Sequence, residues 1–92
     1  MEFEWDPDKA DSNFTKHGVD FADAVAVFDD PRVLSVVDPR SSGERRCQAV
    51  GTVEGRALFV VYTMRGTGVC RIISARRASR RERTAYSLQA RT

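Results

Sequence analysis

The stretch Arg56-Ala57-Leu58-Phe59-Val60-Val61-Tyr62-Thr63-Met64 decides the fold of this 92-residue chain. Its even-numbered residues from 58 to 62 and its odd-numbered residues from 59 to 63 would point to opposite faces of a β-strand. Both sets are largely apolar, so we expect this strand to be central in its sheet and covered on both sides. We therefore expect Leu58, Val60 and Val61 in the hydrophobic core.

Three further strands are predicted around the central one. Glu54-Gly55, just before it, is typical of a hairpin turn. Gly66 and Gly68 indicate a second tight connection after it, and Pro39 to Gly43 reads as a turn-rich loop. The further strands should cover residues 33–38, 45–53 and 69–75.

A helix with clear boundary signals is predicted at the N-terminus. Asp6 is a good N-cap, Pro7 suits the first helical position and Gly18 suits the end of the helix. Four residues at helical spacing should share one face of it: Ala10, Asn13, Phe14 and His17. Trp5, next to the N-cap, should fasten this helix to the body of the protein.

A second helix should begin at Asp20, with Asp23 placed like the acid of a capping box, and end at Asp29-Asp30-Pro31. A last helix is predicted over about residues 78–89. The pattern indicates an α+β fold: a small antiparallel sheet of about four strands, two N-terminal helices and one C-terminal helix. We expect one domain over residues 1–92, because the chain is short.

Charge is divided between the two halves of the chain. Residues 1–44 hold 4 Lys/Arg against 11 Asp/Glu, a net charge of −7, and residues 45–92 hold 11 against 2, a net charge of +9. Every basic residue of the second half is arginine, whose planar fork suits phosphate oxygens. The arginine array comprises Arg65, Arg71, Arg76, Arg77, Arg80, Arg81, Arg83 and Arg91. A solvated helix face could also carry such a run.

Size and composition exclude several classes of protein. A chain this short builds a modest core, so we expect an open surface site or one completed by a partner. The longest apolar run, Ala57 to Tyr62, cannot cross a bilayer, and the acidic N-terminus is unlike a signal peptide, so we expect a cytoplasmic protein. Cys47 and Cys70 lie on separate predicted strands without a CxxC motif and read as small buried residues. We expect no metal site and no cofactor.

The residues resemble the BrnT family of bacterial type II toxins over nearly the whole chain. In the first half the resemblance rests on Glu4-Trp5-Asp6-Pro7, Lys16-His17-Gly18-Val19 and Asp30-Pro31. In the second half it rests on Val61-Tyr62-Thr63 with Arg65, and on Arg71-Ile72-Ile73-Ser74-Ala75-Arg76 with Glu82-Arg83 and Tyr86.

The resemblance implies a RelE-like ribonuclease fold and RNA cleavage that arrests translation. It also implies a hetero-oligomer with a BrnA-type antitoxin that carries a ribbon-helix-helix domain. Operator DNA would then be bound only through the antitoxin, with no membrane partner. Two other readings stay open: a non-catalytic module that binds nucleic acid or a partner protein, and a subunit whose basic face serves only the antitoxin.

Metal-independent RNA cleavage needs stabilisation of the phosphorane, which arginines supply through charge-assisted hydrogen bonds. Arg65 is the leading candidate, since it stands with Thr63 at a strand end beside a glycine-rich turn. The other catalytic candidates are Arg76, Arg77, Tyr86 and Glu82, and the RNA-binding candidates are Arg71, Arg80, Arg81 and Arg83.

Proton carriers are scarce in this sequence. His17 is the only histidine and suits acid–base work. Its place just before a helix-ending glycine favours a structural role. Glu44 could act as a base or pair with Arg45 or Arg46. Glu82 and Tyr86 share one face of the last helix, where they could serve the site or hold the helix to the sheet.

Overall fold

The computed structural model describes residues 1–40 and 43–90, with the side chain of Ala90 left out. Part of the predicted Pro39 to Gly43 loop, and Arg91 of the arginine array, lie outside the described residues. The elements follow one another as β1 (Glu2–Glu4), α1 (Pro7–His17), α2 (Phe21–Ala26), the 3₁₀ turn η1 (Val27–Asp29), β2 (Leu34–Val37), β3 (Cys47–Val53), β4 (Arg56–Arg65), β5 (Val69–Arg77) and α3 (Arg80–Ala90).

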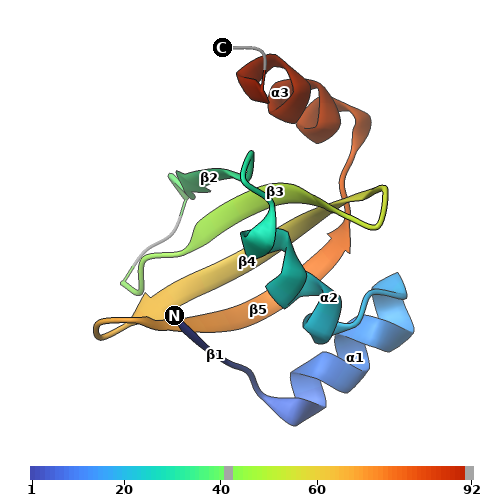
Figure 1. The fold of residues 1–92 in the computed structure, drawn as a ribbon. Coiled ribbons are helices and arrows are strands. Elements are labelled where there is room, and N and C mark those ends of the chain that lie inside the picture. Colours follow the sequence, from blue (N-terminus) through green and yellow to red (C-terminus); the bar gives the residue numbers. More distant parts are fainter. Residues whose placement is uncertain (41–42, 91–92) are drawn as a thin grey trace.

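The five strands form one sheet in the order β1-β5-β4-β3-β2 (Figure 1). The α+β class and the central place of β4 are confirmed, and the sheet has five strands rather than about four and is mixed rather than antiparallel. The short strand β1 pairs in parallel with the start of β5, while the other pairs are antiparallel. Glu54 and Gly55 both have positive φ, as the predicted hairpin turn requires.

A β-bulge in β5 decides which side chains share a face. Val61 lies opposite Ser74, but the next residue of β4, Tyr62, lies opposite Ile72, so Ile73 is the extra residue. In a regular strand Arg71 and Arg76 would point to opposite faces, because their positions differ by five. The bulge instead places both arginines on one face.

The helices α1 and α2 cover the first face of the sheet, where the core lies. Leu58, Val60 and Ile72 are almost wholly buried there, and Trp5 packs edge-on against Phe21 as predicted. Both sides of β4 were expected to be covered, and the cover is less complete on the other face. Val61, expected in the core, is half-buried on the other face, as is Phe59.

The predicted ends of α1 are confirmed, but its buried face is narrower than expected. The Asp6 side chain accepts a hydrogen bond from the Asp8 amide, and Gly18 takes the left-handed conformation that ends the helix. Asn13 faces the sheet and is 7% exposed. Phe14, expected on the same face, points to solvent and is 56% exposed.

Asp20 caps α2 as predicted, through a bond from the Ala22 amide, but Asp23 completes no capping box. Its carboxylate instead forms an ion pair with Arg56 at 3.0 Å. The turn η1 packs closely on β3 because residue 51 is glycine: a Cβ atom there would lie 2.9 Å from a methyl carbon of Val27.

The last helix, α3, contacts β3 and lies at the opposite end of the molecule from α1 (Figure 1). Its N-terminus has a capping box, in which the Ser79 hydroxyl accepts from the Glu82 amide and the Glu82 carboxylate accepts from the Ser79 amide. Leu88, on this helix, is exposed. Polar contacts, rather than a large apolar face, therefore fix α3 to the sheet.

Candidate nucleic-acid interface

The sheet face turned away from α1 and α2, here called the second face, carries four of the predicted site residues: Thr63, Arg65, Arg71 and Arg76. Pairing across β4 and β5 sets Phe59 opposite Arg76, Val61 opposite Ser74 and Thr63 opposite Arg71. Opposite residues of paired strands share a face. Arg71 and Arg76 therefore lie at the two ends of a row of side chains on the second face. The residues between them, Val61 and Ser74, are uncharged.

Two arginines and two glutamates meet at one end of the second face, and we call them the carboxylate–arginine cluster. Arg71 Nη1 donates to Glu4 Oε2 at 2.6 Å, and Arg65 Nε lies 3.7 Å from the same oxygen. Arg65 Nη2 lies 4.0 Å from Glu44 Oε1. The parallel pairing of β1 with β5 sets Glu4 directly beside Arg71. Three elements and the loop before β3 thus contribute to the cluster.

The two arginines of the cluster differ in how firmly they are held. The Arg71 side chain is the less exposed of the two and forms a short ion pair with Glu4. Arg65 has a 54% exposed side chain and makes only long contacts, so its donors can turn to an anionic ligand. Both arginine contacts to Glu4 fall on Oε2, which leaves Oε1 able to accept a proton.

Thr63 lies beneath the cluster but serves as part of the scaffold. Its hydroxyl donates to the Arg45 backbone carbonyl at 2.7 Å, and the residue is 2% exposed. A buried hydroxyl committed to a backbone carbonyl cannot reach a substrate. Thr63 therefore fixes the segment that carries Glu44 and Arg45.

At the other end of the second face, Arg76 is held on three sides. Its two terminal nitrogens donate to the two oxygens of Glu82 at 2.9 and 2.8 Å, and Nη1 also donates to the Arg77 carbonyl. Its guanidinium lies over the Phe59 ring, 4.1 Å from the centroid. Burial raises the pKa of Glu82, but the bonds from Arg76 and Ser79 outweigh this and hold it below its ordinary value.

Tyr86 is hydrogen-bonded to Asp30 in the structure. Its hydroxyl donates to Asp30 Oδ2 at 2.5 Å, and this bond raises the pKa of the phenol. The same carboxylate oxygen accepts from the amide and hydroxyl of Thr52, while Asp30 Oδ1 accepts from the Arg32 amide. Asp30 thereby joins α3 to β3 and to the turn after η1.

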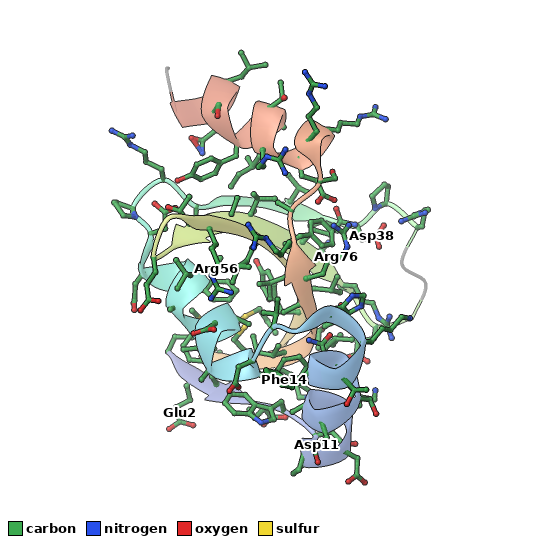
Figure 2. All side chains as sticks on the ribbon, turned by 90° about the vertical axis from the view of Figure 1, so that its right-hand side faces the viewer. Glu2, Asp11, Phe14, Asp38, Arg56 and Arg76 are labelled. Carbon is green, nitrogen blue, oxygen red and sulfur yellow. The ribbon has the colours of Figure 1, made fainter. Side chains whose placement is uncertain are left out.

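The remaining arginine candidates are spread over the α3 end of the molecule. Arg80 and Arg81 are exposed in the first turn of α3. Arg83 donates to the Ala78 carbonyl and, with Arg77, lines a hollow between α3 and the β3–β4 hairpin. Figure 2 shows Arg76 near the middle of the view, between α3 above it and α1 below, with Asp11 and Phe14 at the α1 end.

His17 stands apart from the rest of the candidates. It ends α1, beside Ile73 and Ser74 of β5, and within the described residues no contact joins it to the carboxylate–arginine cluster. Glu44, by contrast, joins the cluster through Arg65. The structure thus brings together Arg65, Arg71 and Glu44, separates them from Arg76 and Glu82, and leaves His17 on the helix side.

Glu4 and Phe59 are site residues that the candidate set lacked. The alternation in Glu2-Phe3-Glu4 is a strand signal, although three residues are too few to predict a strand with force. Phe59 was expected only on a covered face of the central strand, and its contact with Arg76 depends on the bulge in β5. No local pattern in the sequence marks either contact.

Across residues 1–40 and 43–90, no three His, Cys, Asp or Glu side chains gather as a metal-binding group. Cys47 and Cys70 are free thiols, and burial raises the pKa of Cys70 to about 11, so this thiol is not a nucleophile. No helix in the described part of the chain is long and apolar enough to cross a membrane.

Residues 5–82 match the family described as the ribonuclease toxin, BrnT, of type II toxin–antitoxin systems. The chain is a member of this BrnT family, and the resemblance inferred from the sequence is confirmed.

A solved structure gives the same answer. The chain is similar to the Brucella abortus ribonuclease toxin BrnT, solved at 1.1 Å, with 32% sequence identity and a TM-score of 0.67, over 87% of this chain and 99% of that chain. A comparison with curated proteins found no match.

Proposed function

We propose that this chain cleaves RNA without a metal ion at the carboxylate–arginine cluster, and so arrests translation in the cytoplasm. The observation that carries the proposal is the meeting of Glu4, Arg65 and Arg71 on an open sheet face. It supplies the proton carrier that the sequence alone did not reveal. Family membership supports ribonuclease activity in general.

In the proposed reaction, Glu4 Oε1 takes the proton of the 2′-hydroxyl, whose oxygen attacks the adjacent phosphorus. Arg65 donates to the phosphorane oxygens as negative charge develops. The bond from phosphorus to the 5′-oxygen then breaks, the leaving oxygen takes a proton from solvent water, and Glu4 returns the proton it took to solvent. Arg71 orients Glu4 throughout, because it holds Oε2 at 2.6 Å.

The partner we propose is a BrnA-type antitoxin with a ribbon-helix-helix domain, which would bind operator DNA on behalf of the complex. An acidic segment of that antitoxin would compete with RNA for the arginines of the second face. Co-expression with the neighbouring gene product should therefore give a co-purifying complex that does not cleave RNA.

The first prediction concerns the cluster. Purified protein should cleave total RNA in excess EDTA. Arg65→Ala and Glu4→Gln should each lower the cleavage rate roughly 100-fold or more. Arg65→Ala removes a contact to the transition state, and Glu4→Gln removes the base. Glu2→Gln is the matched control, since Glu2 lies on the same strand and is exposed. Its rate should equal that of the wild type.

Three results would count against the proposal. Loss of cleavage in EDTA would mean that the reaction needs a metal. RNA binding without cleavage would favour the non-catalytic binding module. An equal loss in Glu2→Gln and Glu4→Gln would show that β1 contributes only through general charge or folding.

A further inference from the structure

Arg76 presents one flat side of its guanidinium to the surroundings. Three of its five N–H donors are already engaged, two by Glu82 and one by the Arg77 carbonyl. One side of the guanidinium rests on Phe59, yet 38% of the side chain is exposed. The surface of the guanidinium on the side away from the ring is not covered by Phe59 and, with two unengaged N–H donors, is left for a ligand.

A planar cation fixed in this way is suited to stack on an aromatic ligand. Guanidinium planes and aromatic rings are the surfaces on which proteins stack the unpaired bases of RNA. The paired carboxylate of Glu82 sets the plane, and Glu82 is itself fixed by the capping box of α3. The stacking surface is therefore built before any ligand arrives.

We propose that Arg76 is a shelf for one nucleobase of single-stranded RNA, with Phe59 beneath it and Glu82 at its edge. This inference rests on the proposed ribonuclease function and adds a base-binding position to it. It assigns Arg76 a role different from that of Arg65, whose donors make only long contacts and can turn to phosphate.

The shelf and the carboxylate–arginine cluster lie along one strand. Phe59 and Thr63 of β4 are four residues apart, which corresponds to roughly 13 Å. Between them on the second face stand Val61 and, opposite it, Ser74. Neither is charged or large, so a short strand held at the cluster can extend along β4 to Arg76.

The test uses 2′-fluoro hexanucleotides, which lack the attacking hydroxyl and are not cleaved. A single abasic residue is moved through the six positions, and the dissociation constant is measured for wild type, Arg76→Lys and Phe59→Leu. In the wild type, the abasic residue should cost roughly tenfold in affinity at one position, since one stacked base contributes on that scale.

In Arg76→Lys the loss of affinity caused by the abasic residue at that one position should disappear. The affinities for oligonucleotides that are abasic at the other positions, and the salt dependence of binding, should stay as in the wild type, because the charge is kept. Phe59→Leu should reduce the same cost. Arg56→Lys is the control: Arg56 pairs with Asp23 away from the second face, so the wild-type pattern should persist. Thermal unfolding checks that each variant is folded.

An abasic cost in Arg76→Lys equal to that of the wild type would overturn the shelf. So would a uniform loss of affinity for all the oligonucleotides, which would make Arg76 a phosphate contact. In both cases cleavage by the wild type would leave the proposed ribonuclease function standing. A wild type that neither binds nor cleaves RNA would overturn both proposals.

Discussion

At the edge of β5, the Asn13 side chain makes the kind of backbone hydrogen bonds that a neighbouring strand makes elsewhere in the sheet. Strand β1 pairs with β5 only as far as Arg71, so the later residues of β5 need other partners. The Asn13 amide donates to the Ala75 carbonyl at 2.8 Å and accepts from the Ala75 amide at 3.1 Å. It also donates to the Val19 carbonyl. One buried side chain thus joins α1, the loop after it and β5.

The second prediction follows from these bonds. Asn13→Ala should lower the free energy of unfolding by about 3 kcal/mol, because it leaves buried backbone groups of Ala75 unpaired. Ser12→Ala, at an exposed position of the same helix, should change stability far less. Denaturant unfolding of the two variants measures the difference, and a decrease below about 0.5 kcal/mol for Asn13→Ala, the scale of a surface substitution, would contradict the assignment.

At the scale of elements, Asp30 holds α3 against the sheet through its hydrogen bond from Tyr86. Burial raises the pKa of this carboxyl, but the hydrogen bonds from Tyr86, Thr52 and Arg32 outweigh it, and the pKa falls from 3.8 to about 2. A depressed pKa in the folded state means that the ionised form stabilises the fold. This stabilisation is complete above the unfolded value and is lost as the pH falls through the folded value.

The third prediction is therefore a pH dependence. The free energy of unfolding of the wild type should decrease between about pH 4 and pH 2, as Asp30 takes up a proton. Asp30→Asn should be less stable by about 2 kcal/mol at neutral pH, since it removes the charged acceptor from these hydrogen bonds. The gap between the two proteins should narrow across that window.

Asp29→Asn provides the control for that measurement, because Asp29 is the exposed neighbour. Chemical denaturation at a series of pH values gives the curves. A gap between wild type and Asp30→Asn that stays constant down to about pH 2 would show that another carboxyl controls the acid transition.

At the scale of the whole molecule, the charge division of the sequence becomes a division in space. The acidic half supplies α1 and α2, and the basic half supplies β4, β5 and α3 (Figure 1). Arg80 and Arg81 lie in the first turn of α3, where the helix dipole disfavours positive charge. They are therefore better explained by binding an anionic partner than by helix stability.

The fourth prediction tests this division. The double variant Arg80→Gln with Arg81→Gln should bind RNA more weakly and with a shallower salt dependence. The slope should fall by about 0.7 for each phosphate of a single strand that the variant no longer neutralises. Its thermal stability should not fall, because two unfavourable charges leave the helix start. Affinity measured at several salt concentrations gives the slope.

Lys9→Gln with Lys16→Gln removes the same charge from α1 and should leave the slope nearly unchanged. If both double variants flatten it equally, the attraction comes from net charge rather than from a surface around α3.

Elements whose signals are local could be predicted from the amino-acid sequence. The caps at Asp6 and Asp20, the helix end at Gly18 and the Glu54-Gly55 turn each follow from the chemistry of one or two residues. Apolar residues on both faces of the strand over residues 56–64 were enough to place β4 at the centre of the sheet. The family was also recognisable, because its motifs recur in order along the chain.

Which charged residues lie together depends instead on contacts between segments that are distant in the sequence. The bulge at Ile73 put Arg71 and Arg76 on one face, and the parallel pairing of β1 brought Glu4 to Arg71 across 66 intervening residues. Each depends on register between strands, which residue spacing within one strand does not specify. The same holds for Tyr86, Glu82 and Thr63: their roles follow from the partners Asp30, Arg76 and the Arg45 carbonyl that folding brought within hydrogen-bond distance.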